Sequence, residues 1–155
     1  MYERQDRIAE NRVKLEELLV RAHVEAKKAW DLGATEAQME DILQGIRHAQ
    51  WRWDYVAATH GGSFHSPVET GRTLANGITI AQETRIKLAR LLAELGHNEE
   101  IPYPDISTKA KAQEFIGLDM EKLNAEKQEF LKKMVPEWDK QAAEREASWG
   151  VSMTN

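Results

Sequence analysis

Apolar residues recur at steps of three and four along most of this chain, and that spacing restricts it to helices. Such a stripe places side chains on one face of a helix, whereas a half-buried strand alternates at every second residue. Strand alternation and internal repeats are both missing from the sequence. The fold class is therefore all-α, an elongated bundle of long helices with no sheet. The first stripe comprises Ile8, Leu15, Leu18, Leu19, Ala22, Ala26, Ala29 and Trp30.

Cap residues divide the pattern into separate helices. Gly33 ends the first helix, and Thr35 with Gln38 forms the capping box that opens the second. Ser66 is expected to cap a third helix with its side chain, because Pro67 follows it at the first helical position. At about 1.5 Å per residue the third helix is roughly 45 Å long, longer than a compact globule of this size, so the bundle is expected to be elongated.

Prolines mark the second half of the chain. The run Ile101-Pro102-Tyr103-Pro104-Asp105 cannot lie inside a helix, so an extended linker is expected at about residues 97–106. A short helix at 107–115 follows, and then a last long helix from Asp119 that Pro136 should break or kink. The whole chain, 1–155, is taken as a single helical region.

Composition excludes several classes of function. The 155 residues carry a net charge of -5 and include no cysteine. This excludes disulfides, thiolate zinc sites, iron–sulfur clusters and the Cys-x-x-Cys-His attachment of haem c within these residues. The charge argues against a nucleic-acid partner. No apolar run approaches the roughly 20 residues that span a bilayer, and the polar start does not resemble a signal peptide.

His65 is a candidate functional residue because of its position, although the residues by themselves favour an exposed turn histidine. It lies between Phe64 and Ser66, just before the third helix, where a rigid helix start can hold an outward-pointing imidazole. The residues leave two interpretations open, an exposed turn histidine or a ligand. His60 and His65 lack the i, i+4 spacing of a helical metal pair. The run His60-Gly61-Gly62-Ser63 is read as a glycine turn rather than an esterase oxyanion loop.

Two tryptophans of the second helix point in different directions. Trp51 and Trp53 are about 200° apart around the helix axis, and only Trp53 follows the apolar stripe. Trp51 shares another face with Tyr55 and His48. This aromatic face suits either a partner or flat cofactor, or ordinary burial between neighbouring helices.

Four stretches together resemble one family, cytochrome c nitrite reductase, the ammonia-forming pentahaem enzyme. The similarity to the carboxyl-terminal helical part of that family covers almost all of the chain. The stretches are Ile46-Arg47-His48-Ala49-Gln50-Trp51-Arg52-Trp53-Asp54, Phe64-His65-Ser66-Pro67-Val68-Glu69, Pro102-Tyr103-Pro104-Asp105-Ile106-Ser107-Thr108-Lys109 and Val135-Pro136-Glu137-Trp138-Asp139-Lys140-Gln141.

The resemblance implies a cofactor, a ligand and partners. His65 matches the distal axial ligand of one haem iron in that family, and bis-histidine iron suits electron transfer. The resemblance further implies packing against a haem-bearing part of the same enzyme, a homodimer, a redox partner in an electron-transport chain, and a periplasmic location.

The departures from that family restrict what this chain can do. Every haem attachment motif is missing, and the family's catalytic residues and calcium ligands lie upstream of the resembling region. No catalytic residue is therefore assigned, and haem c would be attached to polypeptide outside these residues. We expect a carboxyl-terminal fragment that gives the enzyme scaffold, dimer contact and one haem ligand, and that cannot reduce nitrite alone. The alternative is a stand-alone helical scaffold or interaction protein without catalytic activity.

Overall fold

The computed structural model describes residues 2–149, and within them the regular structure is helical, with no strand. The all-α fold class expected from the sequence is confirmed. The chain divides into two compact units, Met1–Tyr103 and Pro104–Asn155. None of the described helices is long and apolar enough to cross a bilayer.

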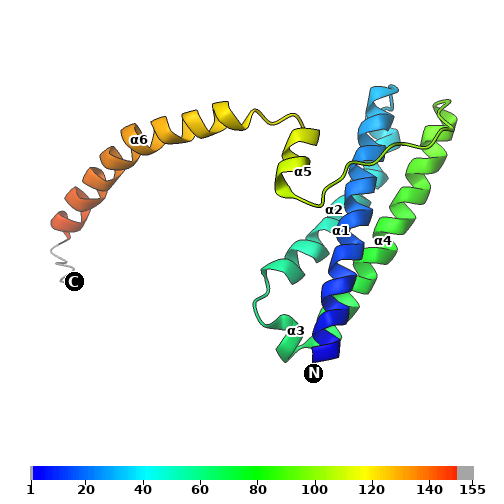
Figure 1. The fold of residues 1–155 in the computed structure, drawn as a ribbon, viewed down its shortest axis with the longest axis horizontal. Coiled ribbons are helices and arrows are strands. Elements are labelled where there is room, and N and C mark those ends of the chain that lie inside the picture. Colours follow the sequence, from blue (N-terminus) through cyan, green and yellow to red (C-terminus); the bar gives the residue numbers. More distant parts are fainter. Residues whose placement is uncertain (1, 150–155) are drawn as a thin grey trace. The chain divides into compact units, whose positions relative to one another are not determined.

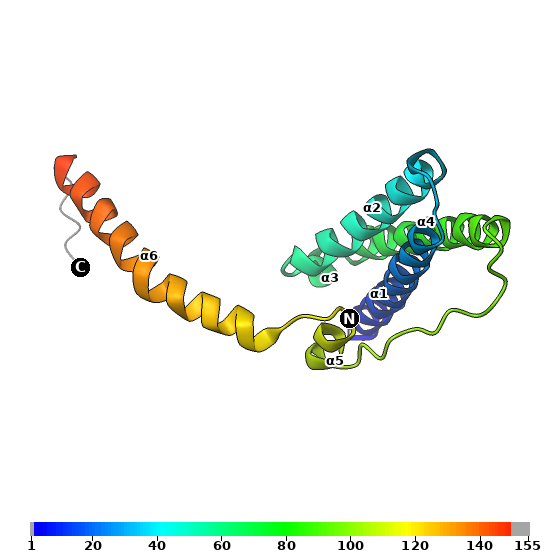
Figure 2. The ribbon, with the colours of Figure 1, turned by 90° about the horizontal axis from the view of Figure 1, so that it is seen from above.

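The first unit is a bundle of three long helices. Its elements are α1 (Tyr2–Asp31), α2 (Glu36–Ala58), the single turn α3 (Gly62–His65) and α4 (Pro67–Glu94). The three long helices pack against one another and alternate in direction along the chain, as Figures 1 and 2 show. The turn α3 lies where the chain passes from α2 to α4, near the start of α1 (Figure 1).

Two clusters of buried side chains form the core of this unit. Small residues let the helices approach closely: a Cβ on Gly77 would lie 2.7 Å from Leu15 Cδ2, so α4 meets α1 at a position without a side chain. One cluster comprises Ile8, Leu15, Leu19, Ala49, Val56, Leu74 and Ala81. The other comprises Ala22, Ala26, Ala29, Ala34, Met39, Ile42, Ile46, Leu88, Leu91 and Leu92. The predicted stripes thus supply the core, although Trp30 stays partly exposed.

The helix starts agree with the sequence in one case and differ in another. At α2 the predicted capping box is present, with Thr35 Oγ1 accepting from Gln38 N–H and the Gln38 side chain accepting from Thr35 N–H. At α4 the predicted side-chain cap is wrong, because Ser66 makes no such bond. The turn α3 ends directly at Ser66, whose N–H donates to Gly62 O and whose backbone is not in the extended geometry of a capping serine.

The chain after α4 has neither helix nor strand from residue 97 to residue 106. Gly96 ends the helix at a φ of +86°, and residues 97–103 then run back along the bundle. Ile101 packs against the core cluster of Ala22 and Leu92, and the Tyr103 hydroxyl bonds to Glu25 of α1. This segment is therefore held to the first unit by side chains rather than by backbone pairing.

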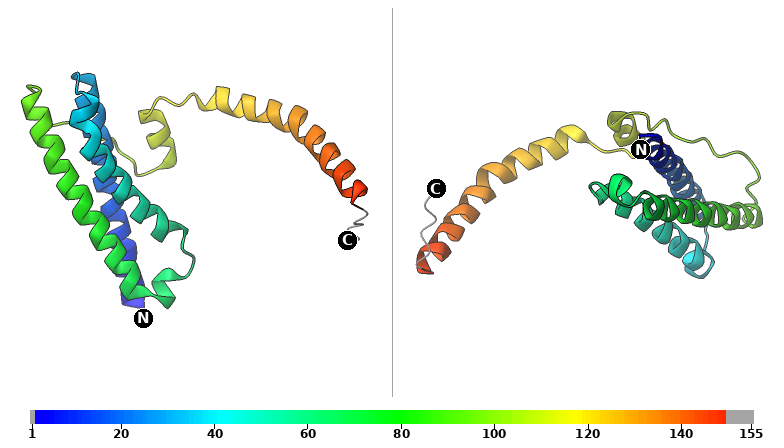
Figure 3. Two further views of the ribbon diagram at one scale, coloured as in Figure 1. Left: turned by 180° about the vertical axis from the view of Figure 1, so that it is seen from behind. Right: turned by 90° about the horizontal axis from the view of Figure 1, so that it is seen from below.

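The second unit contains α5 (Lys109–Phe115) and α6 (Met120–Ser148). Thr108 caps α5 and Asp119 caps α6, each accepting a backbone N–H of the first turn. Of the two effects expected of Pro136, a break or a kink, the break does not occur, since α6 continues through Pro136 as a curved ribbon (Figure 3). No described residue of either helix is buried.

Candidate functional site

A cavity of about 610 Å³ opens where α2 ends and α4 begins, and it contains the candidate ligand His65. Its wall is built from the end of α2, the turn at 59–61, α3 and the first two turns of α4. A volume of this size lies within the range of ligand pockets in proteins. The residues that line it are Trp51, Tyr55, Thr59, His60, Gly61, Gly62, His65, Ser66, Glu69, Thr70 and Thr73.

His65 presents an exposed imidazole to this cavity. Its ring meets the ring of Phe64 edge to face, with centroids 5.0 Å apart and an interplanar angle of 87°. Within residues 2–149 neither ring nitrogen of His65 forms a hydrogen bond or ion pair. The side chain is therefore positioned by an aromatic contact while its nitrogens remain available to a ligand.

Gly61 keeps one side of that imidazole open. Its φ of +80° belongs to the left-handed region that glycine adopts without strain. A Cβ at position 61 would lie 3.2 Å from His65 Cδ2 and 3.7 Å from His65 Nε2. Any side chain at this position would therefore crowd the ring next to its Nε2 atom.

The cavity is also lined by Trp51 and Tyr55, two residues of the aromatic face predicted from the sequence. Trp51 and Tyr55 stack on each other, with centroids 5.5 Å apart and an interplanar angle of 17°. Trp51 is 59% exposed, whereas Trp53 packs against the core cluster. Burial between neighbouring helices is thus excluded for Trp51 within the described bundle. His48, expected on the same face, is exposed but does not line the cavity.

His60 lines the same cavity, but no metal cluster surrounds the two histidines. Among residues 2–149 there is no group of three or more histidine, cysteine, aspartate or glutamate side chains that could hold a metal ion. The described residues therefore give His60 and His65 no polydentate metal site to join.

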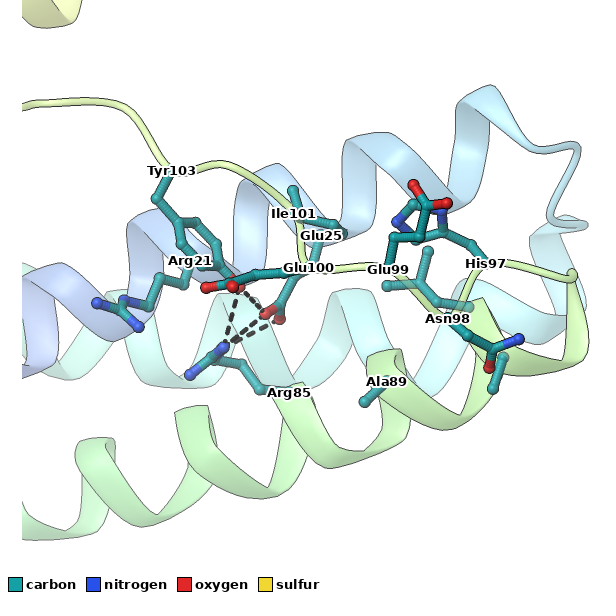
Figure 4. Close-up of a pocket in the computed structure, with 12 residues that line it drawn as sticks. Arg21, Glu25, Arg85, Ala89, His97, Asn98, Glu99, Glu100, Ile101 and Tyr103 are labelled. Carbon is teal, nitrogen blue, oxygen red and sulfur yellow. Dashed lines mark hydrogen bonds and ion pairs between the residues drawn. The ribbon is translucent and has the colours of Figure 1, made fainter.

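A second cavity, of about 440 Å³, lies along α1 and α4 beside residues 97–103 (Figure 4). Its floor holds the Glu25 carboxylate, which is only 6% exposed. Arg85 Nη2 donates to Glu25 Oε1 at 2.6 Å, and its Nε donates to both carboxylate oxygens at 3.0 and 3.1 Å. The Tyr103 hydroxyl donates to Glu25 Oε1 at 2.5 Å.

Two groups of this network, Arg85 and Tyr103, have pKa values above their ordinary ones. The hydrogen bond to Glu25 is the main cause that raises the pKa of Arg85. Burial, and then the hydrogen bond to Glu25, raises the pKa of Tyr103. Arg21 lies over the Tyr103 ring, 4.8 Å from its centroid. Glu25, Arg85 and Tyr103 bond to one another, so the network fastens Tyr103 to the bundle.

The sequence reasoning missed this network, although a signal was present. Glu25 lies between Ala22 and Ala26 in the apolar stripe of α1, where a carboxylate is buried only if it is paired. The sequence could not name the partners, since Arg85 and Tyr103 are 60 and 78 positions away.

Comparison with known proteins places the chain in one family. A family model described as cytochrome c552 matches residues 1–147. A cytochrome c-552 of Bacteroides thetaiotaomicron is 55% identical over 138 residues, which are 89% of this chain and 28% of that protein. Relatives with the same name from Parabacteroides distasonis and Porphyromonas gingivalis are each 53% identical, over 93% and 92% of this chain and 29% and 28% of their own lengths.

These findings correct the resemblance drawn from the sequence. The family model and the relatives all carry the name cytochrome c552, and none of them names a nitrite reductase or a fragment of one. The assignment to a carboxyl-terminal fragment of cytochrome c nitrite reductase is therefore replaced. The family supports haem c and electron transport, whereas calcium is not shown. This chain, which spans 28–29% of the length of those relatives, belongs to the cytochrome c552 family.

Proposed function

We propose that this chain serves electron transfer as a member of its c-type cytochrome family, and that His65 is an axial ligand of a haem iron. The observation that carries the proposal is the exposed His65 imidazole, which faces a cavity of about 610 Å³ and has no bonded partner within residues 2–149. A free neutral imidazole at a fixed position is the ligand type that haem iron takes in electron-transfer proteins.

The residues of the cavity fit a haem ligand but not a haem attachment. The chain contains no cysteine, so the thioether bonds of haem c would have to come from polypeptide other than these residues. When bound, haem supplies an iron that alternates between the ferric and ferrous states and so carries one electron. The family name supports haem c, and His65 is where this chain could meet it.

The chain's own contribution is to orient the ligand. The backbone N–H of His65 donates to Gly61 O at 2.8 Å, which closes the turn α3 directly before α4 begins. Phe64 holds the imidazole edge to face, and Gly61 leaves the side near Nε2 open. Because a ligand held in one direction loses little freedom on binding, this arrangement favours coordination over a mobile surface histidine.

The partners belong to the same proposal. A haem-bearing part of the same protein, a second copy of the chain, a redox partner in electron transport and a periplasmic location would all suit a c-type cytochrome. Their support is the set of large apolar side chains that α6 exposes, which are Leu123, Phe130, Leu131, Met134 and Trp138. An apolar face of this kind suits a protein partner.

The test is titration of the chain with ferrous haem under anaerobic conditions, followed by resonance Raman spectroscopy. A band from the iron–histidine stretch arises only when an imidazole nitrogen is bound to the iron. We expect this band with the unchanged chain and its loss in His65→Ala, while helical circular dichroism stays the same because His65 is exposed.

His60→Ala is the matched control, because His60 lines the same cavity and is equally exposed. It should keep the band. A band that survives in His65→Ala, or one that disappears only in His60→Ala, would overturn the assignment of His65.

A further inference from the structure

The aromatic pair beside His65 has no partner in the bundle. Trp51 and Tyr55 lie one turn apart on α2 and are 59% and 50% exposed, yet they stack with an interplanar angle of only 17°. Because the two rings stack on each other, they form a rigid aromatic pair on α2 that offers apolar surface to the solvent. This surface lines the same cavity as His65, so an occupant of that cavity would meet both the imidazole and the rings.

Trp51 also borders a second hollow that carries positive charge. This hollow, of about 350 Å³, is lined by Trp51, Arg52, Arg72, Thr73 and Asn76. Arg52 Nε donates to Asn76 Oδ1 at 2.6 Å and its Nη1 to His48 O at 2.7 Å, so this guanidinium is fixed. Arg72 pairs with Glu69 at 2.5 Å and is largely exposed, so it can turn toward another carboxylate.

The histidine, the aromatic pair and the arginine hollow all meet at Trp51. The histidine cavity and the arginine hollow adjoin at Trp51 and Thr73, which line both. A metalloporphyrin has matching parts: an iron that takes an imidazole, a flat apolar ring, and two carboxylates at one edge. Few other ligands need all three.

We propose that Trp51 and Tyr55 are the packing surface for the porphyrin ring of the haem that His65 ligates, and that Arg72 binds its carboxylates. This inference rests on the proposed function and adds to it the residues that select a porphyrin. Trp51, Tyr55 and Arg72 are positioning residues, while His65 alone touches the iron.

The first arm of the experiment measures the affinity of the chain for haemin by absorbance titration. Trp51→Ala should weaken binding by about tenfold, a change equivalent to about 1.4 kcal/mol. Trp138→Ala is the matched control, because Trp138 is also an exposed tryptophan, 50% accessible and 5.2 Å from the Phe130 ring. It should leave the affinity of the site unchanged, which separates the site from general attraction of haemin to exposed aromatic side chains.

The second arm compares haemin with its dimethyl ester, in which the two carboxylates are blocked. The unchanged chain should bind haemin more tightly than the ester, by about threefold as expected for an exposed charge pair. Arg72→Gln should abolish this preference. Arg90→Gln, an exposed arginine elsewhere on α4, should preserve it.

The outcomes separate the two proposals. If His65→Ala keeps the iron–histidine band, the proposed function fails. If that band is lost as expected but Trp51→Ala and Trp138→Ala bind haemin alike, the aromatic surface is wrong while His65 stands. Equal affinity for haemin and its ester in the unchanged chain overturns the role of Arg72. Absence of any saturable binding overturns both proposals.

Discussion

Glu25 is the residue on which the docking of residues 97–103 depends, because its buried carboxylate needs both of its partners. Arg85 supplies the charge, and the Tyr103 hydroxyl supplies the short bond at 2.5 Å. Removing one partner of a buried hydrogen bond costs more than the bond is worth when both partners are present. We expect Tyr103→Phe to lower the free energy of unfolding by about 1–2 kcal/mol, measured by urea denaturation.

Tyr55→Phe is the control for that measurement. Its hydroxyl is exposed and forms no hydrogen bond within residues 2–149, so its loss should change the free energy of unfolding by less than about 0.5 kcal/mol. Equal effects of the two substitutions would show that the Tyr103 hydroxyl contributes nothing beyond its ring.

The same tyrosine predicts a dependence of stability on pH. Burial and the hydrogen bond to Glu25 raise the pKa of Tyr103 above its ordinary value of 10.0. Above pH 10 the unfolded chain therefore loses this proton before the folded chain does. The contribution of Tyr103 is fully present below pH 10 and is lost as the pH rises through its raised pKa. The free energy of unfolding should fall more steeply above pH 10 in the unchanged chain than in Tyr103→Phe.

Single residues differ in how far the sequence could place them. The exposed position of His65 and the opposite faces of Trp51 and Trp53 follow from helical spacing and local turns, and both are confirmed by the structure. The pairing of Glu25 with Arg85 and Tyr103 depends on how three distant segments pack. No local pattern carries that information.

Helix starts provide the clearest test among the elements. α2 begins with a complete capping box at Thr35, whereas α4 begins with a serine that makes no side-chain cap. Thr35→Ala should therefore cost about 1 kcal/mol of stability, measured by thermal unfolding. Ser66→Ala should cost less than about 0.5 kcal/mol, contrary to what the Ser-Pro motif suggests. A larger loss from Ser66→Ala than from Thr35→Ala would contradict these helix starts.

Two features of the helices, the turn α3 and the unbroken α6, differ from the prediction for physical reasons. The turn α3 is only four residues long and carries no stripe, so periodicity could not reveal it. Because this turn ends at Ser66, that serine does not adopt the extended backbone that a side-chain cap requires. Pro136 was expected to break or kink α6, but its neighbours keep helical geometry and the helix continues through it. A proline removes one backbone bond, which a long helix tolerates when the turns on both sides continue.

At the scale of the molecule, the buried residues among 2–149 all belong to the first unit. Every buried apolar residue of the described chain lies between Ile8 and Leu92, and the described part of 104–155 contains none. The chain therefore combines a bundle that has a hydrophobic core with a helical unit that has none of its own. The sequence predicted the helices of both units but could not reveal this contrast, because apolar residues along a helix do not show whether another helix covers them.

This contrast predicts different behaviour of the two units in isolation. A chain ending at Tyr103 keeps both core clusters and the Glu25 network, so it should unfold in one cooperative transition, measured by calorimetry. Residues 104–155 alone should be only partly helical and show no cooperative transition, since helical stability in proteins comes mostly from packing. A chain ending at residue 100 is the control: it lacks Ile101 and Tyr103, and its melting temperature should lie roughly 5 °C or more below that of 1–103. A cooperative transition of 104–155 by itself would contradict the assignment of the core to the first unit.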